Sequence, residues 1–375
     1  MGAGVLQGQS FAMPPEQAVR ELARTMAVPG LDLVLLFFSP RYATEAFARA
    51  AAAAFAPARV AGCTTSGEFG PLGYREDSVA AMGFLAPAFG ATLQLLPDLD
   101  RFQAARLAPL ARGLFPRAAP AHRALITLFD GFSGKEEVVV GALHGLAADV
   151  PLCGGSASDG GRLEQSLLLH EGELHRNAAL VVGLASEAPL HVFKTEHFRP
   201  TDQRLVVTAA DSSRRLVREL NGLPAAAEYA RLTGTDPAHL DLAHFAEHPL
   251  MVRVRGANFI RSCIGVDGMG GLRFACAIDV GLVLRLGRGQ DMACDIEGTL
   301  TEVERKVGGP VDILGFDCLL RRQEMEHSGQ MDRIGALMRR HRLLGFSTFG
   351  EQFQGMHINQ TLTGIAFPRG GTAAR

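Results

Sequence analysis

The chain has 375 residues, 47% of them apolar and 20% charged, which is typical of a globular protein with room for two domains. Its 37 basic and 39 acidic residues give a formal net charge of −2, which excludes the basic excess of a general nucleic-acid-binding surface. The six cysteines are scattered and form no C-x-x-C pair. We therefore expect neither a disulfide framework nor a zinc ribbon.

Three observations predict a cytoplasmic protein without membrane insertion. Residues 1–20 lack a basic segment followed by an apolar one, so we expect no secretory signal. The most apolar helical run, residues 43–57, contains Glu45 and Arg49 and is too short to cross a bilayer. Scattered, unpaired thiols suit a reducing compartment.

The first predicted elements form a strand–helix–strand unit. The apolar run Leu31–Phe38 predicts a buried strand, and the Ala-rich stretch Tyr42–Phe55 has the periodicity of a helix. A second strand ends in the Gly-rich motif Gly62-Cys-Thr-Thr-Ser-Gly-Glu68. After an insert, Ser78–Leu85 predicts a third strand.

The same pattern follows further along the chain. Ala124–Asp130 predicts a strand, Lys135–Ala148 a helix, and the next strand ends in Gly154-Gly-Ser-Ala-Ser-Asp159. Ala178–Leu184 then predicts the third strand of a second unit. We place a domain boundary after it, near residue 188.

The region after this boundary does not repeat the strand–helix–strand pattern. His191–Asp202 is extended, and Asn221–Leu232 predicts a turn that leads into a helix. Met251–Ile260 and Leu272–Leu286 predict two strands separated by a Gly-rich turn.

A third unit completes the chain. Val311–Asp317 predicts a strand and Cys318–Arg340 a long helix. The next strand ends in Gly345-Phe-Ser-Thr-Phe-Gly-Glu351, which closely matches the first motif, and Thr361–Phe367 is the last strand. A parallel strand pair needs a helical crossover, so each unit predicts β-α-β. We expect an α/β fold with two pseudo-related domains, residues 15–188 and 189–368, built from repeated β-α-β units around mixed sheets.

The strand-end motifs permit two interpretations. Their glycines, hydroxyls and carboxylates suit tight turns that were repeated when the fold was duplicated. Strand ends of an α/β fold also converge on binding pockets, and a carboxylate there suits the amine of an amino-acid-like ligand as well as it suits a turn. The residues for which both interpretations stay open are Thr65, Glu68, Asp159, Thr348 and Glu351.

Motifs of several enzyme classes are absent from the sequence. It contains no P-loop, no H-E-x-x-H and no G-x-S-x-G motif, and no spacing identifies a nucleophile with its base. We expect a protein that is not an enzyme, although residues distant in sequence can assemble an active site in space.

Three stretches resemble the FIST family of sensory proteins. They are Val60-Ala-Gly-Cys-Thr-Thr-Ser-Gly-Glu68, Leu152-Cys-Gly-Gly-Ser-Ala-Ser-Asp159 and Glu219-Leu-Asn-Gly-Leu-Pro-Ala-Ala-Ala-Glu-Tyr229. The resemblance covers about residues 15 to 368. It implies an N-terminal and a C-terminal FIST domain, and a small-ligand sensor that feeds bacterial signal transduction.

Other stretches are similar to the NosP branch of that family. They are Phe193–Thr201, Leu205–Asp211, Phe316–Arg322 and Gly345–Thr361. This narrower resemblance implies haem b, nitric-oxide sensing, and regulation of a partner histidine kinase in a two-component system that controls cyclic-di-GMP or biofilm formation. Neither composition nor spacing indicates haem.

The resemblance directs attention to two histidines as axial ligands of the haem iron, which is usually held by His and less often by Cys or Tyr. His357 and His197 both lie in NosP-like stretches. Met356 and Phe349 are candidates for porphyrin contacts, and Arg199 for pairing with a propionate. Ordinary hydrogen-bonded histidines are the competing interpretation, and Cys318 or Cys63 a further choice of ligand.

The alternative function is a FIST sensor of another small metabolite, such as an amino acid, without haem. That sensor would use the strand-end hydroxyls and carboxylates. A homodimer is left open as the assembly.

Overall fold

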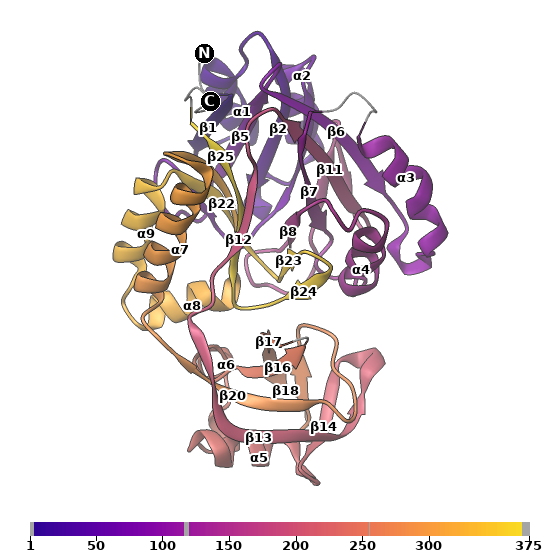
Figure 1. Ribbon diagram of the computed structural model, residues 1–375, viewed down its shortest axis with the longest axis vertical. Helices are drawn as coiled ribbons and strands as arrows, with labels where there is room; N and C mark the ends of the chain where they lie inside the picture. The colour runs from indigo at the N-terminus through magenta and orange to yellow at the C-terminus, as the bar shows by residue number, and fades with distance from the viewer. Residues whose placement is uncertain (1–3, 116–119, 255, 370–375) are drawn as a thin grey trace.

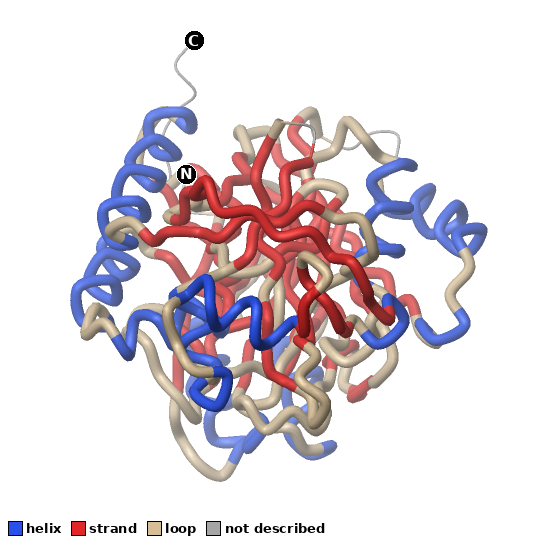
Figure 2. Tube along the Cα trace, turned by 90° about the horizontal axis from the view of Figure 1, so that it is seen from below, coloured by secondary structure: helices blue, strands red, loops and turns tan. Residues whose placement is uncertain are grey.

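Two stacked bodies make up the molecule in the computed structural model, which describes residues 4–115, 120–254 and 256–369 (Figure 1). The upper body contains the described residues from 4 to 197 and from 290 to 369, and the lower body those from 198 to 289. In the upper body the strands lie between helices (Figure 1), and helices are also seen on both sides of the strands from below (Figure 2).

The three predicted β-α-β units form, and each builds the centre of one sheet of the upper body. In each unit the first two strands pair in parallel and the third pairs antiparallel with the first. This mixture of parallel and antiparallel pairs confirms the expected α/β class with mixed sheets.

The strands of the upper body are as follows. The first sheet has the order β1 (Val5–Ser10), β5 (Val79–Leu85), β2 (Leu31–Phe38), β3 (Arg59–Thr64), β9 (Leu168–His170) and β10 (Glu173–His175). The second has the order β24 (Met356–Ile358), β23 (Glu351–Phe353), β8 (Leu152–Ser156), β7 (His122–Phe129), β11 (Ala179–Ser186) and β6 (Phe89–Leu96). The third has the order β12 (His191–Lys194), β25 (Leu362–Pro368), β21 (Val311–Cys318), β22 (Leu343–Thr348) and β4 (Glu68–Phe69).

The insert that follows each strand-end motif adds a strand to the sheet of a different unit. The first unit contributes β4 to the third sheet, next to β22. The second contributes the β9–β10 hairpin to the first sheet, next to β3. The third contributes the β23–β24 hairpin to the second sheet, next to β8. The three units are therefore joined in a closed cycle.

One apolar core lies between the three sheets. Strand side chains alternate between faces, and one face of each sheet contributes to this core. Phe37 of the first sheet stacks on Phe346 of the third at 4.7 Å between ring centroids. The core also contains Ile126 and Leu128 of the second sheet.

The outer face of each sheet is covered by helices. α1 (Pro15–Met26) and α2 (Glu45–Phe55) cover the first sheet, and α3 (Leu107–Leu114) and α4 (Glu136–Leu146) cover the second. α7 (Met292–Val307) and α9 (Met331–Arg340) cover the third. Thr44 and Asp291 begin α2 and α7 as N-caps, accepting hydrogen bonds from the backbone at 3.1 and 2.9 Å.

Three sequence predictions are corrected in detail. The long helix expected over Cys318–Arg340 is two helices, α8 (Leu319–His327) and α9, because Gly329 between them has a left-handed φ of 68°. The strand expected over Met251–Ile260 is a hairpin, with a left-handed Gly256 at its turn. The strand expected over Leu272–Leu286 is interrupted by a loop that contains the left-handed Gly281.

The lower body is an antiparallel sheet with two short helices. Its strands are β13 (Phe198–Asp211), β14 (Leu216–Leu220), β15 (Leu223–Pro224), β16 (Leu250–Val254), β17 (Ala257–Arg261), β18 (Cys263–Val266), β19 (Leu272–Phe274) and β20 (Val283–Gly289). α5 (Ala225–Thr233) follows the predicted turn at Asn221, whose φ is 54°, and α6 (Leu242–Glu247) precedes β16.

The boundary expected near residue 188 stays a prediction. The core between the three sheets contains residues from both sides of it, Leu180 and Leu184 before it and Leu314 and Ile365 after it. The lower body lies within the second of the two predicted sequence ranges.

Candidate functional site

The three strand-end motifs meet at one place in the upper body, here called the strand-end junction (residues 64–68, 156–159 and 347–351). The Ser158 amide donates to the Thr64 carbonyl at 3.0 Å, which joins the second unit to the first. The Ser66 amide donates to the Ser347 carbonyl at 3.2 Å, and the Ser156 amide donates to the Gly350 carbonyl at 2.9 Å. Each pair of units is thus hydrogen-bonded through its motifs.

The shared glycine of each motif is required by a close approach between strands. A Cβ atom on Gly62 would lie 1.8 Å from the Leu36 carbonyl oxygen of the neighbouring strand. The equivalent distances are 2.1 Å for Gly154 and 1.8 Å for Gly345. Real Cβ atoms do not approach a backbone oxygen so closely, so only glycine fits at these three positions.

The two glutamates of the junction are fully buried and bonded in the same way. Glu68 accepts hydrogen bonds from the Thr65 hydroxyl and from the amide and hydroxyl of Ser78, at 3.2 and 2.6 Å for the latter two. Glu351 repeats this pattern with the hydroxyl of Thr348 and with the amide and hydroxyl of Thr361. Burial raises the pKa of both carboxyl groups to about 8, so both are carboxylic acids at neutral pH.

Asp159 holds a turn in the second unit. Its carboxylate accepts from the amides of Leu163, Glu164 and Gln165 at 3.1, 2.6 and 3.1 Å. The five residues predicted at the strand ends are therefore brought to one junction, and each makes hydrogen bonds within the protein.

A cavity of about 280 Å³, the strand-end cavity, opens beside this junction. Thr65 and Asp159 line it, whereas Glu68, Thr348 and Glu351 lie outside its lining. All three units contribute, because α8 of the third unit forms one wall. The other lining residues are Ser39, Pro40, Ser66, Gly67, Glu76, Asp77, Gly160, Gly161, Arg162, Leu319, Arg322, Gln323 and Glu326.

Arg322 is the residue of this cavity that motif analysis did not single out. It donates to the Ser66 carbonyl at 2.6 Å and to Glu326 at 2.8 Å, and it also pairs with Glu76. Gly67, with a φ of 116°, makes room for it, since a Cβ there would lie 2.2 Å from the guanidinium. The only hint in the sequence was that Arg322 is the second of two adjacent arginines in the stretch Phe316–Arg322.

His197 is enclosed in a buried polar network. Its Nδ1 accepts from Arg321 at 2.9 Å and its Nε2 donates to Glu324 at 2.9 Å, while its side chain is 0% exposed. Arg321 in turn donates to the buried Asp317 at 2.6 Å. Burial lowers the pKa of His197, so the ring is neutral with both nitrogen atoms engaged.

His357 lies on β24 at the seam, the surface where residues 356–361 and α4 of the upper body contact the lower body. Its Nδ1 accepts from the Gln352 amide nitrogen at 3.3 Å, which leaves the proton on Nε2. Nε2 has no hydrogen-bond partner among the described residues. Burial lowers the pKa of His357 to about 4, so the ring is neutral.

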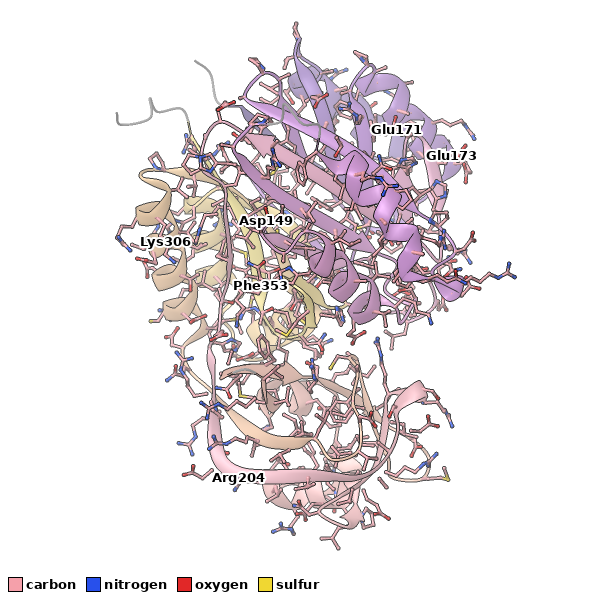
Figure 3. The ribbon with its side chains drawn as sticks, turned by 45° about the vertical axis from the view of Figure 1, so that its right-hand side comes forward. Asp149, Glu171, Glu173, Arg204, Lys306 and Phe353 are labelled. Carbon is pink, nitrogen blue, oxygen red and sulfur yellow. The ribbon has the colours of Figure 1, made fainter. Side chains whose placement is uncertain are left out.

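The other residues expected to contact haem are dispersed. Phe349 packs edge-on against Phe132 at 5.5 Å between ring centroids. Met356 packs against the apolar core of the lower body, as does the neighbouring Phe353, which Figure 3 labels in the lower part of the upper body. Arg199 is exposed on β13 and shares with His197 a cavity of only about 30 Å³.

The residues expected to hold haem are not arranged to bind it in this conformation. Both nitrogen atoms of His197 are occupied, and the cavity beside it is far too small for a porphyrin. Gly350 packs closely against the His357 ring, since a Cβ there would lie 2.7 Å from Nε2. Burial raises the pKa of the Cys63 and Cys318 thiols, which disfavours the thiolate that would bind iron.

The described residues contain neither a cluster suited to a metal ion nor a helix suited to crossing a membrane. Between residues 4 and 369, outside the short gaps, no group of three or more His, Cys, Asp or Glu side chains is arranged for a metal ion. Within those same ranges, no helix has the length and apolar character needed to cross a membrane.

Comparison with known families agrees with the arrangement of motifs. The model of the FIST N domain matches residues 32–223, and the model of the FIST C domain matches residues 225–354. No curated protein gives a significant match to the chain. The chain belongs to the FIST family, whose domains are small-ligand sensory domains of signalling proteins.

Proposed function

We propose that this protein senses a small polar metabolite, such as an amino acid, bound in the strand-end cavity. The observation that carries this proposal is the cavity itself, because residues of all three units line it where their strand ends converge. Its volume of about 280 Å³ suits a ligand of amino-acid size. Sensing needs binding without turnover, in keeping with the sensory character of FIST domains.

The charges around the cavity favour a ligand with an amino group. Glu76, Asp77 and Glu326 are acidic residues of the lining, and Arg322 already has three acceptors. An ammonium group would find carboxylate oxygens there, while backbone groups and the exposed Arg162 remain for a carboxylate.

α8 offers a route from this cavity to the lower body. Leu319, Arg322 and Glu326 of α8 line the cavity, and Leu320 of the same helix packs against Leu242 and Ala246 at α6. A ligand that binds differently to two positions of α8 would shift the balance between them. We expect the signalling partner to be a histidine kinase of a two-component system.

Thermal unfolding in the presence of each amino acid tests the proposal. A ligand present at a hundred times its Kd should stabilise the protein by about 2.7 kcal/mol. Gln323→Phe fills the cavity without removing a hydrogen bond, so it should abolish the shift. Exposed Gln103→Phe is the matched control and should keep it. A response that survives in Gln323→Phe would place the ligand elsewhere.

A haem-containing nitric-oxide sensor, as in the NosP branch, is the second candidate function. The observation that favours it is the neutral His357 ring, whose Nε2 has no hydrogen-bond partner among the described residues and could bind iron once its proton had moved to Nδ1. Haem b would require the seam to open around this ring, since the described conformation leaves no room for it. Bound haem would supply an iron centre for nitric oxide.

Reconstitution with haemin separates the two candidates. A stoichiometric Soret band that His357→Ala removes and His197→Ala retains would support the haem sensor. A colourless protein with an amino-acid-dependent melting temperature would support the metabolite sensor. Size-exclusion chromatography with light scattering would show whether either form is a homodimer.

A further inference from the structure

Several buried polar atoms at the seam lack hydrogen-bond partners. Asn359 follows β24 and is 1% exposed, yet neither its Oδ1 nor its Nδ2 makes a hydrogen bond. A Cβ on Gly350 would lie 2.8 Å from Asn359 Nδ2 and 2.7 Å from His357 Nε2, so both groups pack against this glycine. Buried polar groups without partners are rare and often mark an unseen water or ion.

Arg261, at the end of β17, brings a half-buried guanidinium to the same place, beside the buried Cys276 thiol. Its Nε and Nη1 are buried and have no hydrogen-bond partner. The neighbouring Ser262 hydroxyl donates to Gln360 at 2.9 Å, which fixes the end of β17 next to residue 359. The Arg261 charge also acts on His357, whose pKa it helps to lower.

The other charges of the seam compensate one another. Arg215 pairs with Glu137 at 2.8 Å and with Glu136 at 3.4 Å, and it donates to the Ala275 carbonyl at 2.6 Å. Glu137 also accepts from the Ala277 amide at 2.7 Å. No carboxylate among the described residues pairs with Arg261, and it is unfavourable to bury two nitrogen atoms of a guanidinium without an acceptor.

We propose that the seam binds a small anion of the carboxylate class between Arg261 of the lower body and Asn359 and His357 of the upper body. The free groups are mostly donors: the Arg261 guanidinium, the Asn359 amide and the protonated Nε2 of His357. A neutral imidazole can donate to an anion without adding a second charge. The bound anion would hold the two bodies together at this point, independently of the strand-end cavity.

Acetate and bromide are suitable probes of this site. We expect acetate to raise the melting temperature of the full chain by about 2 to 5 °C at saturating concentration, with ionic strength held constant by tosylate. Arg261→Gln should lose this rise. Arg253→Gln changes an exposed arginine on the adjacent strand and should retain it. The same acetate response in wild type and Arg261→Gln would overturn the proposal.

A second variant keeps the test decisive if Arg261→Gln does not fold. Asn359→Asp has nearly the same shape and supplies a carboxylate from the chain itself. We expect it to melt higher than wild type in buffer without acetate, and to respond no further to acetate. Crystals soaked in bromide should show an anomalous peak within hydrogen-bonding distance of Arg261. The absence of that peak, or an undiminished acetate response in Asn359→Asp, would contradict the proposed site.

Discussion

The strand-end junction and the seam contain the same kinds of polar side chain, but they differ in whether those side chains have partners. At the junction Glu68 and Glu351 are 0% exposed and each accepts three hydrogen bonds. At the seam Asn359 is equally buried and makes none with its side chain.

This difference separates a structural network from a binding surface. A buried polar network in which every group is satisfied fixes one arrangement of the chain. Buried groups without partners cost free energy, and a protein retains them where a ligand or a motion uses them. The junction therefore explains why the three motifs resemble one another, and the groups without partners at the seam are those to which we assign the proposed anion.

The largest expected effect comes from breaking the junction at its glycines. Gly62→Ala and Gly345→Ala each place a Cβ 1.8 Å from a carbonyl oxygen of the neighbouring strand. We expect a loss of about 4 kcal/mol or more in the free energy of unfolding, or failure to fold, measured by urea denaturation. Gly298→Ala, in α7 with nothing within 4 Å, is the control and should be neutral or stabilising by up to about 1 kcal/mol. An equal loss of unfolding free energy in Gly298→Ala and Gly62→Ala would contradict the explanation that the motif glycine is required by the close approach of the neighbouring strand.

The second largest expected effect is a difference in stability between His197→Ala and His357→Ala. His197→Ala removes the hydrogen bonds to both Arg321 and Glu324. Arg321 keeps its ion pair with Asp317, but the largely buried Glu324 carboxylate loses its partner, so we expect a cost of about 3 kcal/mol. His357→Ala leaves a similar cavity but breaks only the bond to Gln352. We expect His197→Ala to be more destabilising by about 2 kcal/mol in chemical denaturation. The reverse order would mean that His357 has a partner that the described residues do not include.

The protonated glutamates predict a pH effect of intermediate size. Because burial raises the pKa of Glu351 from 4.5 to about 8, the folded protein keeps a proton that the unfolded chain releases. The stabilising contribution of this group is complete below pH 4.5 and is lost as the pH rises toward 8. The loss is at most about 1.4 kcal/mol per pH unit for each such group.

Glu351→Gln isolates that effect. The variant cannot release a proton, so its stability relative to wild type should increase between pH 6 and pH 7 by about 1 kcal/mol. Glu173→Gln, at the outer edge of the upper body in Figure 3, should show no such trend. Parallel pH profiles for wild type and Glu351→Gln would indicate that the carboxyl group is already ionised at pH 6.

Much of the upper body could be predicted from the sequence because its signals are local. The apolar run Leu31–Phe38 is β2, and the three third strands begin within a residue of their predicted starts. The division of the predicted helix after Cys318 was missed because Gly329 was the only strong signal within an otherwise periodic stretch. Strand registers and the exchange of inserts depend on contacts such as Gly345 with Phe69, which no local pattern encodes.

The candidate sites were only partly predictable for the same reason. The motifs indicated that Thr65 and Asp159 belong together, and both line the strand-end cavity. Arg261 and Asn359 lie in no repeated motif, and their importance comes from partners that they lack in the folded protein. A missing hydrogen bond is a property of three-dimensional packing, so sequence patterns cannot reveal it.

The smallest expected effect concerns the ion pairs by which Arg215 of the lower body contacts α4 of the upper body. Arg215→Gln removes its pairs with Glu136 and Glu137, and burial together with the second carboxylate already holds the pKa of Glu136 at about 7. Without the guanidinium, Glu136 should take up a proton near neutral pH instead of remaining an unpaired charge, which limits the loss in stability to about 1 kcal/mol. Hydrogen exchange should then accelerate in residues 198–289 and not in the core of the three sheets, because the contact holds the lower body alone. Uniform acceleration in both bodies would show that they unfold as one unit, and the seam would then be part of the same network as the junction.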